Sequence, residues 1–340
     1  MAAVEGPVEN RMKHVKHIII VLAGKGGVGK SSVSTQLALS LYSLSPESSP
    51  SGAKPKVGIL DIDLTGPSIP RMLGVDGRAV HQSTEGWVPV YADATEQRLA
   101  CMSVGFLLKR KGDSVVWRGP KKNAMIRQFL SDVRWGNLDY LIIDTPPGTF
   151  MILTCNQGFM ENRIPNIAIG TSDEHLSLLE HLAPLHPRLS ALIVTTPQAV
   201  ALADGLKCLS FARATNLLVL GLIENMSGYA CPCCGEVSNV FSSGGGKAMA
   251  QREGVAFLGA LPVDTKLVEL LDGEAIAGQV ETATRENAGG LIDQSEEENK
   301  EHAFALMERY QETPTYELFR GMSEKVLSQL QEMPSIAPVG

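Results

Sequence analysis

One short glycine-rich segment limits the possible folds of this chain more than any other feature. Residues 24–31 read GKGGVGKS and fit the pattern G-x-x-x-x-G-K-[ST]. They follow a continuous apolar run at residues 17–23, of the kind buried in a parallel sheet, and precede a helical pattern at residues 30–42. Backbone N–H groups in such a loop converge on phosphate oxygens, and the helix dipole favours the same negative charge. The segment therefore predicts a nucleotide phosphate site between a strand and a helix.

The side chains of this segment suit ATP with Mg²⁺. Lys30 would neutralise the β- and γ-phosphates, and the Ser31 hydroxyl would ligate Mg²⁺. A glycine-rich turn without a ligand is the less favoured alternative, because a strand pattern precedes it and a helix pattern follows. We expect the nucleotide to be held by Gly24, Lys25, Gly26, Gly27, Val28, Gly29, Lys30, Ser31 and Ser32.

Aspartates end two further apolar runs. Asp61 and Asp63 close the segment VGILDID, and Asp144 closes YLIID. Ligands of α/β sheets bind at the carboxyl ends of the strands, so we expect all three acids near the phosphate site. Asp144 is the candidate for holding Mg²⁺ through water. We assign Asp63 and Asp144, with Lys25 and Lys30, to catalysis and Asp61 to nucleotide binding.

Strand and helix patterns alternate along the chain. Further strands are predicted at residues 57–61, 99–104, 140–144, 191–195, 217–224 and 255–261, with helical patterns between them. This alternation predicts an α/β fold with one doubly wound, mostly parallel sheet. The expected organisation is a flexible leader (1–16), a P-loop ATPase domain (17–275), an acidic surface insertion (276–313) and a C-terminal helix and tail packing on the same domain (314–340).

Composition excludes several classes of protein. A net charge of −7 argues against a chain that coats nucleic acid or anionic membranes. No apolar run reaches the length of a membrane span, and residues 1–16 carry acidic residues but no apolar signal region. We therefore expect a cytoplasmic protein that binds neither nucleic acid nor membrane.

Three of the six cysteines, Cys231, Cys233 and Cys234, fall in one loop. The C-x-x-C spacing lets Cys231 and Cys234 face one soft metal centre and supply half of a four-thiolate site. A two-fold dimer would supply the second pair. Zinc and an iron–sulfur cluster both accept four thiolates, so the spacing leaves the metal open. We expect Cys233 to be a bystander.

Seven segments resemble, in order, the Mrp/nucleotide-binding-protein family of iron–sulfur scaffold ATPases. They are GKGGVGKSS, DIDLTGPSIPRMLG, VVWRGPKKNAMI, LDYLIIDTPPGT, VTTPQAV, ENMSGYACPCC and VFSSGGGKAMA, and the similarity covers roughly residues 15–273. The short, Cfd-type branch is the most similar, because residues 1–16 contain no cysteine, whereas a longer paralogue has an N-terminal four-cysteine extension. The resemblance implies the deviant Walker A (SIMIBI) class, in which Lys25 reaches the partner subunit's nucleotide. It also implies that Asn225, Pro262 and Asp264 lie near the adenine.

The resemblance further implies an ATPase that assembles [4Fe–4S] clusters on Cys231 and Cys234 of two subunits and transfers them to cytosolic and nuclear apoproteins. The expected partners are apo iron–sulfur proteins and the longer paralogue with ferredoxin-like cysteines, in a heterotetramer, with a homodimer also possible. Two alternatives stay open. A MinD/ParA-like positioning ATPase shares the phosphate site but has no use for the thiol pair, and a zinc-bridged dimeric ATPase would use the same thiolates.

Residues 150–171 depart from the family pattern. In the family the turn PPGT runs directly into SDEH, but here 22 residues separate them. We favour a retained intron or another gene-model error over a genuine surface insertion. A real insertion would weaken the coupling between the γ-phosphate and the cluster, and transcript sequencing distinguishes the two.

Overall fold

The structure is a computed structural model. It describes residues 6–46, 52–64, 66–107, 119–148, 152–153, 168–169, 173–231, 233–234, 236–239, 242–272 and 305–332. The expected acidic insertion therefore lies largely outside the described residues. Residues 305–311, at its end, are helical, and Leu306 and Tyr310 are buried in the core.

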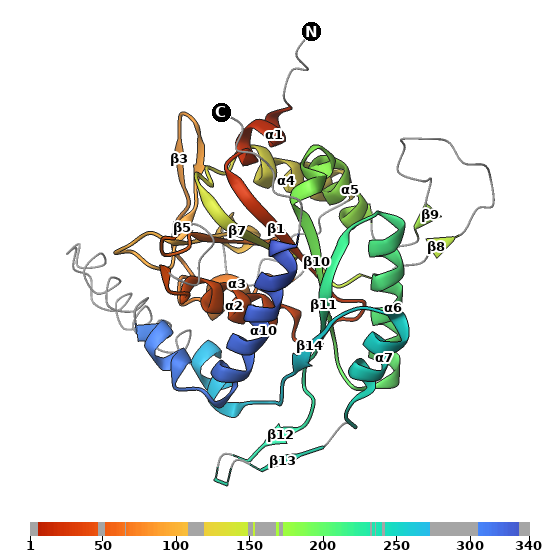
Figure 1. The fold of residues 1–340 in the computed structure, drawn as a ribbon. Coiled ribbons are helices and arrows are strands. Elements are labelled where there is room, and N and C mark those ends of the chain that lie inside the picture. Colours follow the sequence, from red (N-terminus) through yellow and green to blue (C-terminus); the bar gives the residue numbers. More distant parts are fainter. Residues whose placement is uncertain are drawn as a thin grey trace.

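Eight strands form the central sheet, in the order β14-β11-β10-β1-β7-β2-β6-β5 (Figure 1). Their bounds are β1 (Val15–Leu22), β2 (Val57–Asp61), β5 (Val90–Tyr91), β6 (Leu99–Ser103), β7 (Leu138–Asp144), β10 (Leu189–Thr195), β11 (Leu218–Glu224) and β14 (Phe257–Ala260). All neighbouring strands are parallel except β5, which pairs antiparallel with β6. The predicted α/β fold with a mostly parallel sheet is confirmed.

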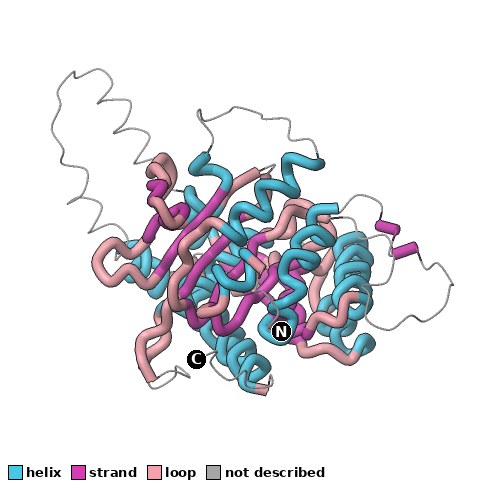
Figure 2. The backbone as a smooth tube through the Cα atoms, turned by 90° about the horizontal axis from the view of Figure 1, so that it is seen from above, coloured by secondary structure: helices cyan, strands magenta, loops and turns pink. Residues whose placement is uncertain are grey.

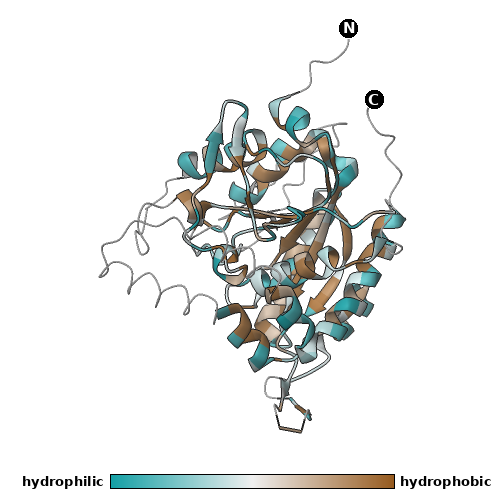
Figure 3. Ribbon diagram, turned by 90° about the vertical axis from the view of Figure 1, so that its left-hand side faces the viewer, coloured by the Kyte–Doolittle hydropathy of each residue, from teal (hydrophilic) through white to brown (hydrophobic). Residues whose placement is uncertain are grey.

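The continuous apolar run in β1 follows from its central place in the sheet. Successive side chains of a strand point to opposite faces. Ile19 and Val21 accordingly belong to the core on one face, whereas Ile18 and Ile20 belong to the core on the other. Both faces are covered by helices, so both sets of side chains have to be apolar (Figures 2 and 3).

Helices divide between these two faces. On one face α2 (Lys30–Tyr42) and α10 (Pro314–Gln331) contribute apolar side chains to the core. On the other face the contributing helices are α1 (Pro7–Met12), α4 (Gly119–Ser131), α5 (Asp173–Leu182), α6 (Ala199–Ala214) and α7 (Gly245–Glu253). Shorter elements are α3 (Ile69–Met72), η2 (Val104–Leu107) and η3 (Ala183–Arg188).

The structure differs from the sequence expectation at the amino-terminal end. Residues 7–12, expected within a flexible leader, form α1, and β1 already begins at Val15. Val8 and Met12 are buried against α4 and α5, and this apolar contact holds the segment on the sheet.

Three two-stranded hairpins lie outside the central sheet. They pair β3 (His81–Ser83) with β4 (Gly86–Val88), β8 (Ile152–Leu153) with β9 (Ala168–Ile169), and β12 (Tyr229–Ala230) with β13 (Val237–Ser238). Apart from β8 and β9, residues 150–171 lie outside the described part of the chain, so their origin stays a prediction. None of the described helices combines the length and apolar character needed to cross a bilayer.

Candidate nucleotide site and cysteine loop

The glycine-rich loop connects the carboxyl end of β1 to the first residue of α2. Gly27 and Gly29 have φ values of +78° and +79°, in the left-handed region that favours glycine. A Cβ atom on Gly27 would meet nothing within 4 Å, so the loop backbone faces open space at the helix N-terminus. Such a cradle of N–H groups fits the phosphates of a nucleotide. Lys25 is exposed on the same loop.

Lys30 and the first hydroxyls of α2 converge on one carboxylate. The Nζ atom of Lys30 lies 2.7 Å from Oδ1 of Asp144, at the end of β7. Ser31 donates a hydrogen bond of 2.7 Å to Oδ2 of Asp144, and Ser34 donates one of 2.6 Å to Oδ1. Asp144 is fully buried. The three residues that we expected to handle the γ-phosphate and Mg²⁺ therefore meet at one point.

A second buried carboxylate, Asp61, lies beside Asp144. The two residues are paired in register across β2 and β7. Burial, reinforced by the nearby Asp144, raises the pKa of Asp61 to about 7. Its Oδ1 atom accepts a hydrogen bond from the backbone of Asp63 (3.1 Å), and its Oδ2 atom accepts one from Ser103 (3.0 Å). Hydroxyl and carboxylate oxygens are hard ligands, and the donor set of Ser31, Asp144 and Asp61 fits Mg²⁺.

His175 is a residue of this region that sequence reasoning missed. It lies in α5, is almost fully buried, and lies near the backbone of Pro146 in the turn after Asp144. Burial and the charge of Lys30 lower its pKa to about 3, so the imidazole is neutral. The segment SDEH was visible in the sequence, but only the fold shows that its histidine contacts the PPG turn.

The turn after Asp144 is tied to β1 by two hydrogen bonds. Thr145 donates its hydroxyl to the carbonyl of Val21 (2.7 Å), and the backbone of Gly148 donates to the carbonyl of Ala23 (3.3 Å). The PPG turn thus runs along the start of the glycine-rich loop.

The three residues expected near the adenine differ in their surroundings. Asn225 donates from Nδ2 to the carbonyl of Val28 (2.9 Å), so it lies directly on the glycine-rich loop. Pro262 is partly buried. The carboxylate of Asp264 accepts hydrogen bonds from the backbone of Lys266 and from Thr315, and so joins two helices. Adenine contact stays a prediction for all three.

Cysteines 231, 233 and 234 lie in the loop of residues 228–243, called here the cysteine loop, which contains the β12–β13 hairpin (Figure 1). Cys233 and Cys234 are exposed, and Cys231 is partly so. Hydrogen bonds from the backbone N–H groups of Cys234 and Cys233 lower the pKa of the Cys231 thiol. A thiolate is the form that binds soft metals. By contrast, burial raises the pKa of Cys101 and of Cys208.

Among the described residues, no group of three or more histidine, cysteine, aspartate or glutamate side chains is placed to hold a metal ion.

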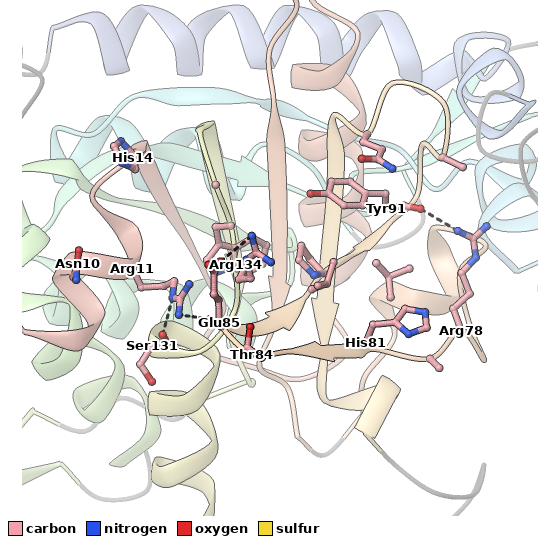
Figure 4. A pocket seen from close by; sticks show the side chains of 18 of the residues that line it. Asn10, Arg11, His14, Arg78, His81, Thr84, Glu85, Tyr91, Ser131 and Arg134 are labelled. Carbon is pink, nitrogen blue, oxygen red and sulfur yellow. Dashed lines mark hydrogen bonds and ion pairs between the residues drawn. The ribbon is translucent and has the colours of Figure 1, made fainter.

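A cavity of about 1530 Å³ lies at the amino ends of the strands, the end of the sheet opposite to the glycine-rich loop. It is formed between α1, the β3–β4 hairpin and residues 131–136 (Figure 4). Several cationic side chains line it, and three of them have partners. Arg78 donates to the backbone carbonyl of Tyr91 (3.0 Å). Arg11 donates to the carbonyls of Ser131 and Glu85, and Arg134 forms an ion pair with the Glu85 carboxylate at 3.1 Å. No residue of the glycine-rich loop lines this cavity, which is separate from the phosphate site.

Comparison with known proteins gives matches over most of the chain. Residues 14–162 and 166–294 match the family described as ParA: NUBPL iron-transfer P-loop NTPase. The cytosolic Fe-S cluster assembly factor CFD1 of Mycosarcoma maydis is 56% identical over 294 residues, which cover 84% of this chain and 74% of that protein. Human cytosolic Fe-S cluster assembly factor NUBP2 is 54% identical over 258 residues, which cover 76% of this chain and 83% of the human protein.

Among solved structures, a nucleotide-binding protein from Archaeoglobus fulgidus in complex with ADP superimposes with a TM-score of 0.60 at 33% identity. The alignment covers 79% of this chain and 90% of the archaeal one.

Proposed function

The chain belongs to the ParA/NUBPL iron-transfer family of P-loop NTPases, and on that premise we propose that it is an ATP-dependent scaffold for iron–sulfur cluster assembly in the cytosol. The observation that carries this proposal is the joint position of two sites. The glycine-rich loop follows β1 and the thiols of the cysteine loop follow β11, both at the carboxyl ends of the strands of one mostly parallel sheet. Two relatives are named as cytosolic Fe-S cluster assembly factors, which supports the compartment and the cargo.

In the proposed cycle, ATP binds along residues 24–32. Lys30 would exchange its ion pair with Asp144 for the β- and γ-phosphates, and Asp144, Ser31 and Asp61 would then be the residues that hold Mg²⁺. The metal ion supplies positive charge that offsets the charge of the phosphates. Asp63 and Asp144 are the acidic residues that we assign to catalysis of ATP hydrolysis. Lys25, exposed on the loop, reaches the nucleotide of a second subunit.

The cargo is a [4Fe–4S] cluster, held by Cys231 and Cys234 of two subunits. One chain supplies two thiolates, and a two-fold dimer supplies the four that such a cluster requires. The lowered pKa of Cys231 favours the thiolate that binds iron. We expect the longer paralogue with ferredoxin-like cysteines to be the partner, in a heterotetramer, and apo iron–sulfur proteins of cytosol and nucleus to receive the cluster.

Anaerobic reconstitution with iron and sulfide tests the cargo. Wild-type protein should take up about two iron atoms per chain, as expected for four iron atoms shared by two chains, and show the Mössbauer signature of a [4Fe–4S] cluster. Cys231→Ala should lose the iron and keep ADP binding. Cys233→Ser is the matched control and should keep both. Unchanged iron in Cys231→Ala, or a colourless wild type with stoichiometric zinc, contradicts the proposal.

A further inference from the structure

Glu224, the last residue of β11, closes the base of the cysteine loop. Its carboxylate is fully buried. Oε1 accepts hydrogen bonds from the hydroxyl of Ser227 (2.6 Å) and the backbone of Gly244 (3.2 Å), and Oε2 accepts one from the backbone of Gly246. Ser227 directly precedes the cysteine loop, and Gly244 directly follows it. One side chain therefore holds the outgoing and the returning ends of the segment that carries the thiols.

The close approach at this point leaves little room for movement. A Cβ atom on Gly246 would lie 2.9 Å from Oε2 of Glu224, so α7 starts in contact with the carboxylate. The positive end of the α7 dipole faces the negative charge and stabilises it. In the described part of the chain Glu224 has no cationic partner, and a carboxylate buried without an ion pair is costly. The three hydrogen bonds from the two ends of the cysteine loop offset that cost.

The neighbouring residue connects this base to the nucleotide loop. Besides its hydrogen bond to the carbonyl of Val28, Asn225 packs so closely that a Cβ atom on Gly29 would lie 2.1 Å from its Nδ2 atom. Gly29 directly precedes Lys30. Between Asn225 and Ser227 the chain passes through Met226, whose φ of +56° lies in the left-handed region. That backbone is rare for a side chain of this size and persists only where its surroundings fix it.

We infer that Glu224 is a positioning residue that, through Asn225, couples the nucleotide state of the glycine-rich loop to the geometry and reactivity of the thiols in the cysteine loop. The inference rests on the proposed function and identifies the residues that link the nucleotide site to the thiols. A displacement of the loop backbone at Val28 and Gly29 pulls on Asn225. Glu224 fixes both ends of the cysteine loop, so the two ends cannot move independently. The displacement therefore changes the orientation of the whole loop.

The test measures thiol alkylation in the full chain without iron. The rate of iodoacetamide labelling is measured by mass spectrometry of the peptide that contains Cys231, Cys233 and Cys234. One sample contains a non-hydrolysable ATP analogue with Mg²⁺, and the other contains no nucleotide. We expect the two rates to differ about fivefold or more in wild type, the range usual for coupled sites. In Glu224→Gln, which keeps the volume but loses the charge, the ratio should fall to within about twofold of unity, with analogue affinity unchanged.

Glu236→Gln is the matched control. It makes the same chemical change on an exposed residue of the same loop and should keep the wild-type ratio. Ser227→Ala removes one hydrogen bond to the carboxylate and should give an intermediate ratio, which keeps the test decisive if Glu224→Gln folds poorly.

A wild-type ratio in Glu224→Gln and Ser227→Ala overturns the inference. So does the absence of any nucleotide effect in wild type. Neither result touches the proposed function, which stands or falls on the separate measurement of iron content.

Discussion

Asp61 and His175 are two buried titratable residues near the phosphate site whose pKa values are displaced in opposite directions. The pKa of Asp61 rises from 3.8 to about 7, mainly because of burial and then because of Asp144. The folded protein therefore binds more protons than the unfolded chain between these values, and stability falls as pH rises through that window. The pKa of His175 falls from 6.5 to about 3, so its contribution to stability is lost as pH falls below its ordinary value.

Asp61→Asn should therefore change how stability depends on pH. The Asp61 contribution disappears in the variant, so wild type should lose stability relative to it as pH rises from about 4 to about 7, by at most about 1.4 kcal/mol per pH unit. Urea unfolding without nucleotide, at several pH values across this window, measures the difference. Lost hydrogen bonds to Ser103 and Asp63 add an offset that does not vary with pH. Two curves that run parallel across the window would show that Asp61 is ionised throughout.

Asp264 joins the end of the sheet to the C-terminal helix. Its Oδ1 atom accepts from the backbone of Lys266 (3.0 Å) and Leu267 (3.3 Å), at the start of the helical segment 265–272. Its Oδ2 atom accepts from the backbone (3.2 Å) and hydroxyl (2.9 Å) of Thr315, in the first turn of α10. One carboxylate thus satisfies donors at the N-termini of two helices, where negative charge is favoured.

Asp264→Ala should consequently destabilise the protein by about 2–4 kcal/mol, the combined effect of a lost helix cap and an unsatisfied buried hydroxyl. Denaturant unfolding measures this change. Asp272→Ala is the control, since its exposed carboxylate lies 3.7 Å from Arg71 and should contribute less than about 0.5 kcal/mol. A loss in Asp264→Ala no greater than in the control would mean that other groups cap both helices.

The elements that the sequence predicts best are those with a strong local signal. The β-branched runs of β1, β7 and β10 and the glycine-rich loop are each readable within a few residues. The two- and three-residue strands β3, β4 and β5 have no period to detect, and α1 was hidden because so short a helix has little periodicity.

The base of the cysteine loop was unpredictable for a different reason. Glu224 meets its glycine partners 20 and 22 residues further along the chain, and Asn225 meets Val28 across 197 residues. Such contacts depend on strand order. The sequence predicts the glycine-rich loop and the thiols, but it does not predict that the Glu224 carboxylate joins the two ends of the cysteine loop.

The carboxyl ends and the amino ends of the sheet strands, called here the carboxyl edge and the amino edge, carry different kinds of residues. The carboxyl edge has the phosphate loop, Lys25 and the cysteine loop, whereas the amino edge has the cavity lined by Arg11 and Arg134 (Figures 1 and 4). Under the proposed function, two thiolates from one chain would complete only half of a cluster site, and Lys25 is exposed on its own loop. Both features favour a second subunit facing the carboxyl edge.

A subunit interface on that edge predicts a dimer that depends on nucleotide and on Lys25. With a non-hydrolysable ATP analogue and Mg²⁺, the mass of the wild-type protein measured by light scattering should double. Lys25→Ala should raise the dissociation constant of that dimer about tenfold, as expected for one lost charge contact of about 1.4 kcal/mol, and leave ADP binding by the monomer unchanged. Lys54→Ala removes an exposed lysine that precedes β2, at the amino edge, and should dimerise like wild type. A wild-type protein that stays monomeric when loaded with both nucleotide and iron would exclude a shared cluster, because the missing two thiolates would then have no source.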